Sequence, residues 1–125
     1  MLNNAPVTAI LPVVDMQRAR KFYEDTLGLP VKEELAADHL LYECGEGTAL
    51  LIYKRGQTKA DHTAAGFWVQ DLDAEMAELR NKGVVFEEYD FPGLKTANGV
   101  ATIGNEKSAW FKDPEGNILA LTQKI

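Results

Sequence analysis

The sequence predicts an α+β fold made of two copies of one module, each with the order strand, helix, strand, strand, strand. Val13-Val14-Asp15-Met16 is matched 56 residues later by Val69-Gln70-Asp71-Leu72. Both segments stand between an apolar run and a stretch with helical spacing of apolar residues, and a glycine closes each stretch, Gly28 and Gly83. We interpret this as an internal duplication within one domain, residues 1–125, with modules at about 5–54 and 63–124.

The first module opens with an apolar run at residues 7–14, which predicts a buried strand. Pro12 lacks a backbone donor, so this strand is expected at a sheet edge or to end early. Asp15 is a typical N-cap residue, and a helix is predicted from there to Gly28. Strands are predicted at 30–35, 39–44 and 48–53, with Gly45-Glu46-Gly47 as the hairpin turn between the last two.

The second module repeats this order. A strand is predicted at 64–70, and Asp71 precedes a helix whose apolar stripe is Leu72, Met76 and Leu79. Strands follow at 84–89, 107–112 and 117–122, with Asp113-Pro114-Glu115-Gly116 as the last turn. Residues 91–106 are an insertion relative to the first module, either a mobile lid or a solvated loop. The polar segment 54–63 is predicted to link the modules.

Composition narrows the function classes. With 13 basic and 19 acidic residues the chain has a net charge of −6, which argues against a nucleic-acid partner. No apolar run reaches the roughly 20 residues that a membrane span needs, so no membrane partner is expected. Cys44 is the only cysteine, which excludes an internal disulfide and a cysteine-rich zinc motif. The first residues lack the pattern of a signal peptide, and we expect a cytoplasmic protein.

Three segments carry a family resemblance: residues 14–29, with Val14-Asp15-Met16, Phe22-Tyr23 and Leu27-Gly28-Leu29; residues 67–74, Phe-Trp-Val-Gln-Asp-Leu-Asp-Ala; and residues 110–117, Trp-Phe-Lys-Asp-Pro-Glu-Gly-Asn. In this order and spacing they resemble the vicinal oxygen chelate superfamily. That superfamily includes glyoxalase I, bleomycin-resistance proteins, fosfomycin-resistance thiol transferases and extradiol dioxygenases. The resemblance implies two paired modules that form a curled mixed sheet around one cavity.

Enzymes of this superfamily hold a divalent metal in the cavity with His, Glu or Gln side chains. The resemblance places the four ligand positions on Thr8, Leu51, Ala64 and Ala120. Three of these side chains have no donor atom, and a threonine hydroxyl is a poor sole ligand for a transition metal. We therefore expect no metal and no cofactor, and enzymatic activity stays open. His62 is the candidate for a relocated ligand, although a solvated linker histidine explains it more simply; His39 is expected at the surface.

Given those positions, strand alternation names the residues expected to line the cavity. The resemblance adds Ser108 and Trp110, because family members contact ligand three and five residues before the Asp of the Asp-Pro-x-Gly turn. The predicted ligand-binding residues are Thr8, Ile10, Ala49, Leu51, Tyr53, Ala64, Trp68, Ser108, Trp110 and Ala120. Two tryptophans and a tyrosine among small residues are typical of a pocket that stacks flat or apolar ligands. The alternative is that both tryptophans simply fill the core.

No catalytic residue is assigned, and Cys44 is expected to be a buried strand cysteine rather than a nucleophile. Two functions remain open. The first is a small-molecule binding or sequestering protein, similar to the bleomycin-resistance branch, whose ligand is flat, apolar or cationic. The alternative is a metal-dependent glyoxalase- or dioxygenase-like enzyme with relocated ligands such as His62. Members of the family usually dimerise, so a homodimer is expected.

Overall fold

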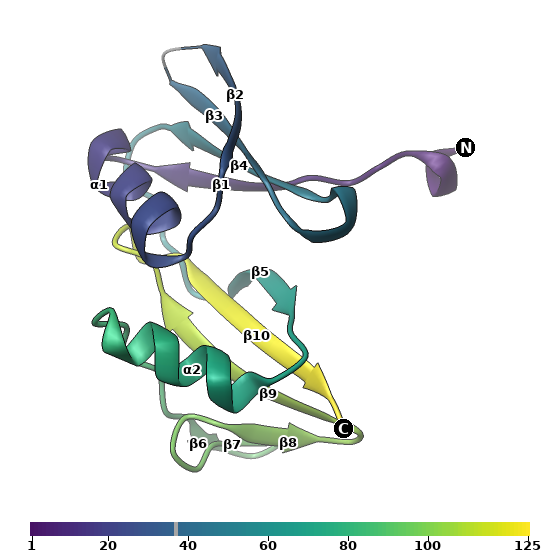
Figure 1. Ribbon diagram of the computed structural model, residues 1–125. Helices are drawn as coiled ribbons and strands as arrows, with labels where there is room; N and C mark the ends of the chain where they lie inside the picture. Colours follow the sequence, from purple (N-terminus) through teal and green to yellow (C-terminus); the bar gives the residue numbers. More distant parts are fainter. Residues whose placement is uncertain (37) are drawn as a thin grey trace. The chain divides into compact units, whose positions relative to one another are not determined.

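The structure is a computed structural model that describes residues 1–36 and 38–125. The chain divides into two compact units, Met1–Lys59 and Ala60–Ile125. Each unit contains a four-stranded mixed sheet and one main helical segment, which confirms the predicted α+β class (Figure 1). Among the described residues, no helix is long and apolar enough to cross a membrane.

The first unit has the strand order β1-β4-β3-β2. Its strands are β1 (Ala9–Val13), β2 (Val31–Ala36), β3 (His39–Glu43) and β4 (Ala49–Lys54). β1 pairs with β4 in parallel, and the other neighbours are antiparallel. β1 lies at the edge of this sheet, where the missing N–H of Pro12 is tolerated, as the sequence predicted. The strand ends differ from the predicted ones by one or two residues.

The helical segment of the first unit begins where Asp15 predicts it. The Asp15 carboxylate accepts a hydrogen bond from the Arg18 N–H at 3.1 Å, and helix α1 (Met16–Arg20) follows. The helical segment continues to Thr26, as predicted, but residues Lys21–Thr26 form a π-helix, η2, instead of an α-helix. Leu27 N–H bonds Phe22 C=O at 2.9 Å, the i to i−5 pattern of a π-helix, and Gly28 then turns the chain with φ +74°. Short 3-10 turns, η1 (Leu2–Asn4) and η3 (Gly45–Gly47), complete this unit. η3 is the predicted hairpin turn, because it connects the antiparallel strands β3 and β4.

Alternate side chains of the first sheet form its core against this helix. The buried residues, each at most 3% exposed, are Leu11, Val13, Ala19, Tyr23, Leu40, Tyr42, Leu50 and Ile52. Tyr23 and Tyr42 stack with ring centroids 5.9 Å apart. Burial of these large apolar side chains supplies the main favourable free energy of this unit.

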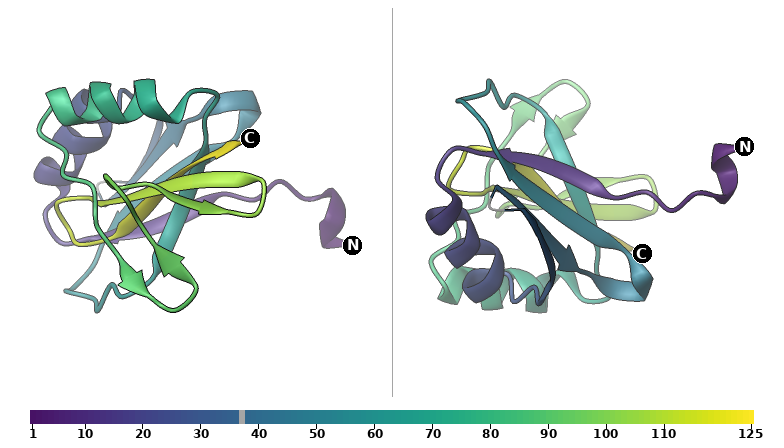
Figure 2. Two further views of the ribbon diagram at one scale, coloured as in Figure 1. Left: turned by 90° about the horizontal axis from the view of Figure 1, so that it is seen from below. Right: turned by 90° about the horizontal axis from the view of Figure 1, so that it is seen from above.

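The second unit repeats the arrangement, with the strand order β5-β10-β9-β8. Its strands are β5 (Thr63–Trp68), β8 (Ala101–Ile103), β9 (Glu106–Lys112) and β10 (Ile118–Lys124). Asp71 caps helix α2 (Leu72–Asn81) by accepting from the Ala74 N–H, and the predicted stripe Leu72, Met76 and Leu79 is buried. α2 contacts β9 and β10 and runs beside them (Figure 2).

The same parallel register occurs in both units. Ile10 of β1 lies opposite Leu51 of β4, and Gly66 of β5 lies opposite Ala120 of β10 in the same parallel pairing. Ile10 corresponds to Gly66 by the spacing between the caps Asp15 and Asp71, and Leu51 corresponds to Ala120 by the spacing between the turn residues Gly47 and Gly116.

The prediction of a strand at 84–89 is wrong. Within that described stretch, Phe86 forms one isolated bridge to Phe111, and Glu87 N–H bonds Trp110 C=O at 2.8 Å. Two segments pair with the same edge of β9. Phe86 bridges Phe111 near the end of the strand, and β8, which comes from the insertion, pairs with its beginning. The insertion at 91–106 is therefore partly ordered in strands, including the hairpin of β6 (Asp90–Phe91) and β7 (Leu94–Lys95), rather than one irregular loop.

Candidate functional site

The sheet of the second unit has one face packed on α2 and an opposite face that carries both tryptophans. Arg80 of α2 lies over the Phe86 ring, 5.2 Å from its centroid, and Phe86 packs edge-on against Phe111 of β9 at 5.6 Å. Phe111 and Ala109 are fully buried on this side. Because strand side chains alternate, Ser108 and Trp110 point to the opposite face.

The register places six side-chain positions in two rows on that opposite face. In one row Ala120 lies between Gly66 and Trp110; in the other Thr122 lies between Trp68 and Ser108. We call this set the tryptophan face: Gly66, Trp68, Ser108, Trp110, Ala120 and Thr122. The two tryptophans occupy diagonal corners, and standard strand spacings put their Cα atoms about 12 Å apart. Between them the floor has only small side chains.

Contacts at the two corners differ. Trp68 is 66% exposed, and the Lys124 ammonium lies 5.3 Å from its ring centroid. Trp110 is half-buried, with the Tyr89 ring edge-on at 5.6 Å, and Tyr89 in turn contacts Phe91 at 5.9 Å. The exposure of Trp68 contradicts the alternative that both tryptophans fill a core.

The floor between the tryptophans carries two hydroxyl groups. Ser108 Oγ and Thr122 Oγ1 share a hydrogen bond at 2.8 Å. Alternation from Ala120 predicts that Thr122 shares its face, and the register confirms this. Lys124 and Tyr89 are not among the predicted site residues. The same alternation extends to Lys124, whereas nothing local in the sequence connects Tyr89 to Trp110.

The predicted site residues of the first unit share the corresponding face of their own sheet. Ile10 and Leu51 are paired in the register, and Pro12 is paired with Tyr53. Ala49 alternates onto the same side, and Thr8 stands just before β1. His39 is opposite Tyr53, and their rings stack with centroids 6.1 Å apart. Glu43, paired with Ala49, and Glu33, paired with Leu41, also lie on this face, so it mixes apolar and acidic side chains. Ile10 is 59% exposed.

The positions that hold the metal in related enzymes do not fit a metal here. Leu51 and Ala120 are strand residues with apolar side chains, and Ala64 is the extra residue of β5 where the β5–β10 register shifts. Among residues 1–36 and 38–125, no group of three or more His, Cys, Asp or Glu side chains is arranged to hold a metal ion. His62 is exposed and contacts its neighbour Asp61, Nδ1 to Oδ1, at 3.1 Å.

Cys44 is half-buried just beyond the end of β3, rather than inside the strand as predicted. Burial raises the pKa of its thiol. A raised pKa keeps the thiol protonated at neutral pH, so Cys44 lacks the thiolate character of a nucleophile.

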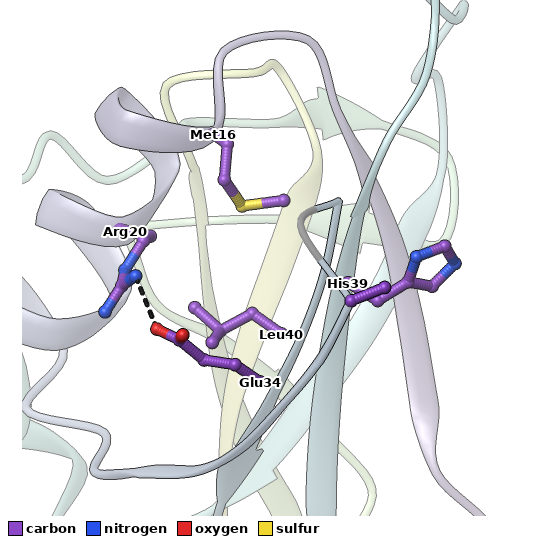
Figure 3. Close-up of a pocket in the computed structure, with 6 residues that line it drawn as sticks. Met16, Arg20, Glu34, His39 and Leu40 are labelled. Carbon is purple, nitrogen blue, oxygen red and sulfur yellow. Dashed lines mark hydrogen bonds and ion pairs between the residues drawn. The ribbon is translucent and has the colours of Figure 1, made fainter.

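A pocket of about 210 Å³ lies in the first unit between α1 and strands β2 and β3. Its lining residues are Met16, Arg20, Glu34, Ala36, His39 and Leu40 (Figure 3). The Arg20–Glu34 ion pair, 2.9 Å from Nη1 to Oε1, connects the helix to β2, and the His39 ring points away from it. Arg20 Nε also bonds Glu24 at 2.8 Å, and the Tyr42 hydroxyl donates to Glu24 at 2.8 Å. These charged groups already pair with one another, which gives them a structural role.

The insertion of the second unit is tied to α2. The Glu88 carboxylate accepts from the Thr96 hydroxyl and, at 2.9 Å, from the Gly99 N–H. Arg80 donates to the Asn98 carbonyl at 3.1 Å. These bonds anchor the segment that the sequence left open as a lid or a solvated loop.

Comparisons with known proteins agree with this architecture. The family model described as "Glyoxalase/Bleomycin resistance protein/Dioxygenase superfamily" matches residues 5–121. The chain belongs to this superfamily. The residues that carried the resemblance therefore identified the family correctly, while no curated protein gives a significant match.

Solved structures of the same fold cover nearly the whole chain. TnmS3, an antibiotic binding protein from Streptomyces sp. CB03234, has 23% identity and a TM-score of 0.76, covering 100% of this chain and 99% of that one. A lactoylglutathione lyase from Agrobacterium tumefaciens has 19% identity and a TM-score of 0.72, covering 96% and 93%. A glyoxalase / bleomycin resistance protein from Catenulispora acidiphila has 21% identity and a TM-score of 0.73, covering 96% and 98%. At these identities the likeness concerns the fold.

Proposed function

We propose that this protein is a small-molecule binding or sequestering member of the superfamily that uses no metal, and that its tryptophan face binds a flat, apolar or cationic molecule. The observation that carries the proposal is Trp68, a large aromatic side chain left 66% exposed beside a floor of small residues. An exposed indole next to Gly66 and Ala120 leaves room for a flat ring to lie against it. Stacking and cation–π attraction are the interactions that such a surface offers.

Charge and polarity favour the same class of ligand. Residues 60–125 include 11 acidic and 6 basic side chains, so the second unit has a negative field that attracts cations. The Ser108 and Thr122 hydroxyls supply hydrogen-bonding groups on the floor. The fold likeness to an antibiotic binding protein supports small-molecule binding as the general function.

The remaining predicted residues complete the proposal. In the second unit, Ala64 and Ala120 are further proposed ligand contacts. In the first unit, the proposed ligand contacts on its own sheet are Thr8, Ile10, Ala49, Leu51 and Tyr53, of which Thr8 and Tyr53 carry hydroxyl groups. We also propose a cytoplasmic homodimer; light scattering that gives the mass of one chain at micromolar concentration would refute the dimer.

Substitution of each tryptophan tests the site. Quinoline and its cation N-methylquinolinium serve as flat probes, with binding followed by isothermal titration calorimetry. Trp68→Ala and Trp110→Ala should each weaken binding about two- to ten-fold, the equivalent of one aromatic stacking contact. Since Trp68 is largely exposed, Trp68→Ala should leave the free energy of unfolding within about 1 kcal/mol of wild type.

Val85→Ala is the matched control, because Val85 is 76% exposed in the same unit and lies outside the tryptophan face. The proposed site would be refuted if both tryptophan variants bound the probes with the same affinity as Val85→Ala. Trp110→Phe is a second variant that keeps an aromatic ring against Tyr89 if Trp110→Ala fails to fold.

Metal analysis separates this function from the metal-dependent enzyme. Protein purified without chelator is expected to contain well under one equivalent of Ni, Zn, Mn or Fe, because Leu51, Ala64 and Ala120 have no donor atoms. A tightly bound stoichiometric metal that disappears in His62→Ala would favour the enzyme with relocated ligands instead.

A further inference from the structure

We propose that Lys124 is a resident cation on the tryptophan face, and that a cationic ligand binds by displacing its ammonium group from Trp68 toward Glu106. Lys124 thereby sets the charge preference of the site. This inference rests on the proposed function of the same face.

The position of Lys124 follows from the β10 register. Alternation puts Lys124 on the same face as Ala120 and Thr122, and its ammonium lies 5.3 Å from the Trp68 ring centroid. The backbone here is fixed, because Lys124 is paired in the β9–β10 ladder and Ile125 N–H bonds the Asn105 carbonyl at 2.7 Å. The side chain is exposed, so the ammonium can move while the strand stays in place.

Glu106 is the group that can receive the displaced ammonium. It lies directly opposite Lys124 in the antiparallel register, on the same face of the sheet. Opposite charges at such a cross-strand position attract one another. At the other end of the face, Lys112 is already 3.4 Å from Glu87. Lys124 is thus the side chain whose charge can shift between the indole and a carboxylate.

The consequence concerns selectivity. A neutral flat ligand meets no charge repulsion from Lys124, whereas a cation must replace one ammonium–indole contact with another. In the wild-type protein, the preference for a cation over a neutral molecule of the same shape should therefore be smaller than two free indoles would give. Removing the Lys124 ammonium should increase the ratio of the two affinities.

The test compares three flat probes of similar shape by isothermal titration calorimetry: N-methylquinolinium, quinoline and 2-naphthoate. Lys124→Gln should raise the affinity for N-methylquinolinium about two- to five-fold relative to quinoline, which is one exposed cation–π contact. Glu106→Gln should weaken cation binding more when Lys124 is present than in the Lys124→Gln background. In the free protein, NMR should find the Lys124 ε-methylene protons shifted upfield by the Trp68 ring, and that shift should vanish when the cation binds.

Lys107→Gln is the matched control for the loss of one positive charge. Lys107 is on β9, the strand next to β10, and on the opposite face of the sheet, 3.8 Å from Asp73 of α2. A cation-to-neutral affinity ratio that changes equally in Lys107→Gln and Lys124→Gln would overturn the inference. The inference would also be overturned if wild type bound 2-naphthoate more tightly than quinoline and Lys124→Gln abolished that preference, because Lys124 would then be an anchor for acidic ligands. Both results leave the tryptophan site intact, whereas failure of every probe to bind would refute that site as well.

Discussion

The side chains of Arg20, Glu24 and Tyr42 illustrate how single residues stabilise the first unit. The hydrogen bond from Arg20 and the one from the buried Tyr42 hydroxyl lower the pKa of Glu24 below its ordinary 4.5. Because the folded pKa lies below the unfolded one, ionised Glu24 stabilises the fold above the unfolded pKa. That contribution is lost as the pH falls through the folded pKa.

We therefore expect the stability of wild type to approach that of Glu24→Gln in acid. The difference in the free energy of unfolding between the two should be largest above about pH 5 and should shrink toward about pH 3. Urea titrations across this range measure it. Glu33→Gln, at an exposed position of β2, is the control. A difference for Glu24→Gln that is the same at every pH would contradict the assignment.

At the scale of elements, the docking of the insertion on α2 depends on Gly99. Its φ is +82°, and an added Cβ would lie 3.1 Å from Phe86 Cβ and 3.2 Å from Met76 Cε. Its N–H also donates to Glu88. An alanine here combines a left-handed backbone penalty with contacts tighter than side chains normally make, so Phe86, Met76 or the loop has to shift by a few tenths of an ångström.

Gly99→Ala should lower the free energy of unfolding by about 2–4 kcal/mol, the sum of these two costs. Gly104→Ala is the matched control, because Gly104 has φ +59° but open space around its Cα. It should show the backbone cost alone, about 1–2 kcal/mol. Equal losses for the two variants, measured by urea unfolding, would mean that the contacts with Met76 and Phe86 contribute nothing.

Over the whole molecule, the acidic excess is concentrated in one half. Residues 1–59 contain 8 acidic and 7 basic side chains, against 11 and 6 in residues 60–125. A long-range field of this kind attracts cations and is screened by salt.

Binding of N-methylquinolinium should therefore weaken as NaCl rises from about 0.02 M to about 0.5 M, where the Debye length falls well below 10 Å. Quinoline, which has no charge under these conditions, should bind equally well or slightly better at high salt. Calorimetry at several salt concentrations measures both. If the affinities for the two probes changed with NaCl concentration in the same way, the charge distribution would play no part in binding.

Much of the fold could be predicted from local patterns. Asp15 and Asp71 mark both helix starts because a carboxylate cap bonds the N–H three residues later, within the same turn. Apolar alternation located most strands, and the three segments 14–29, 67–74 and 110–117, in that order and spacing, identified the family. Alternation placed Trp68 in the predicted site, and the family resemblance added Ser108 and Trp110; the register puts all three on one face.

Local patterns do not show which distant segments pair with the same strand edge, and this became visible only in the tertiary structure. The segment 84–89 begins with Val84, Val85 and Phe86, residues that favour a strand, but β8 pairs with part of the β9 edge and, of these described residues, Phe86 alone forms a bridge to β9. The π-helical turns after Arg20 and the approach of Tyr89 to Trp110 have no local signature. Lys124 lies over Trp68, 56 residues earlier in the chain, because β10 pairs with β5 in one register. Neighbours in sequence determine helix caps and strand faces, whereas contacts across strands exist only after the sheet has assembled.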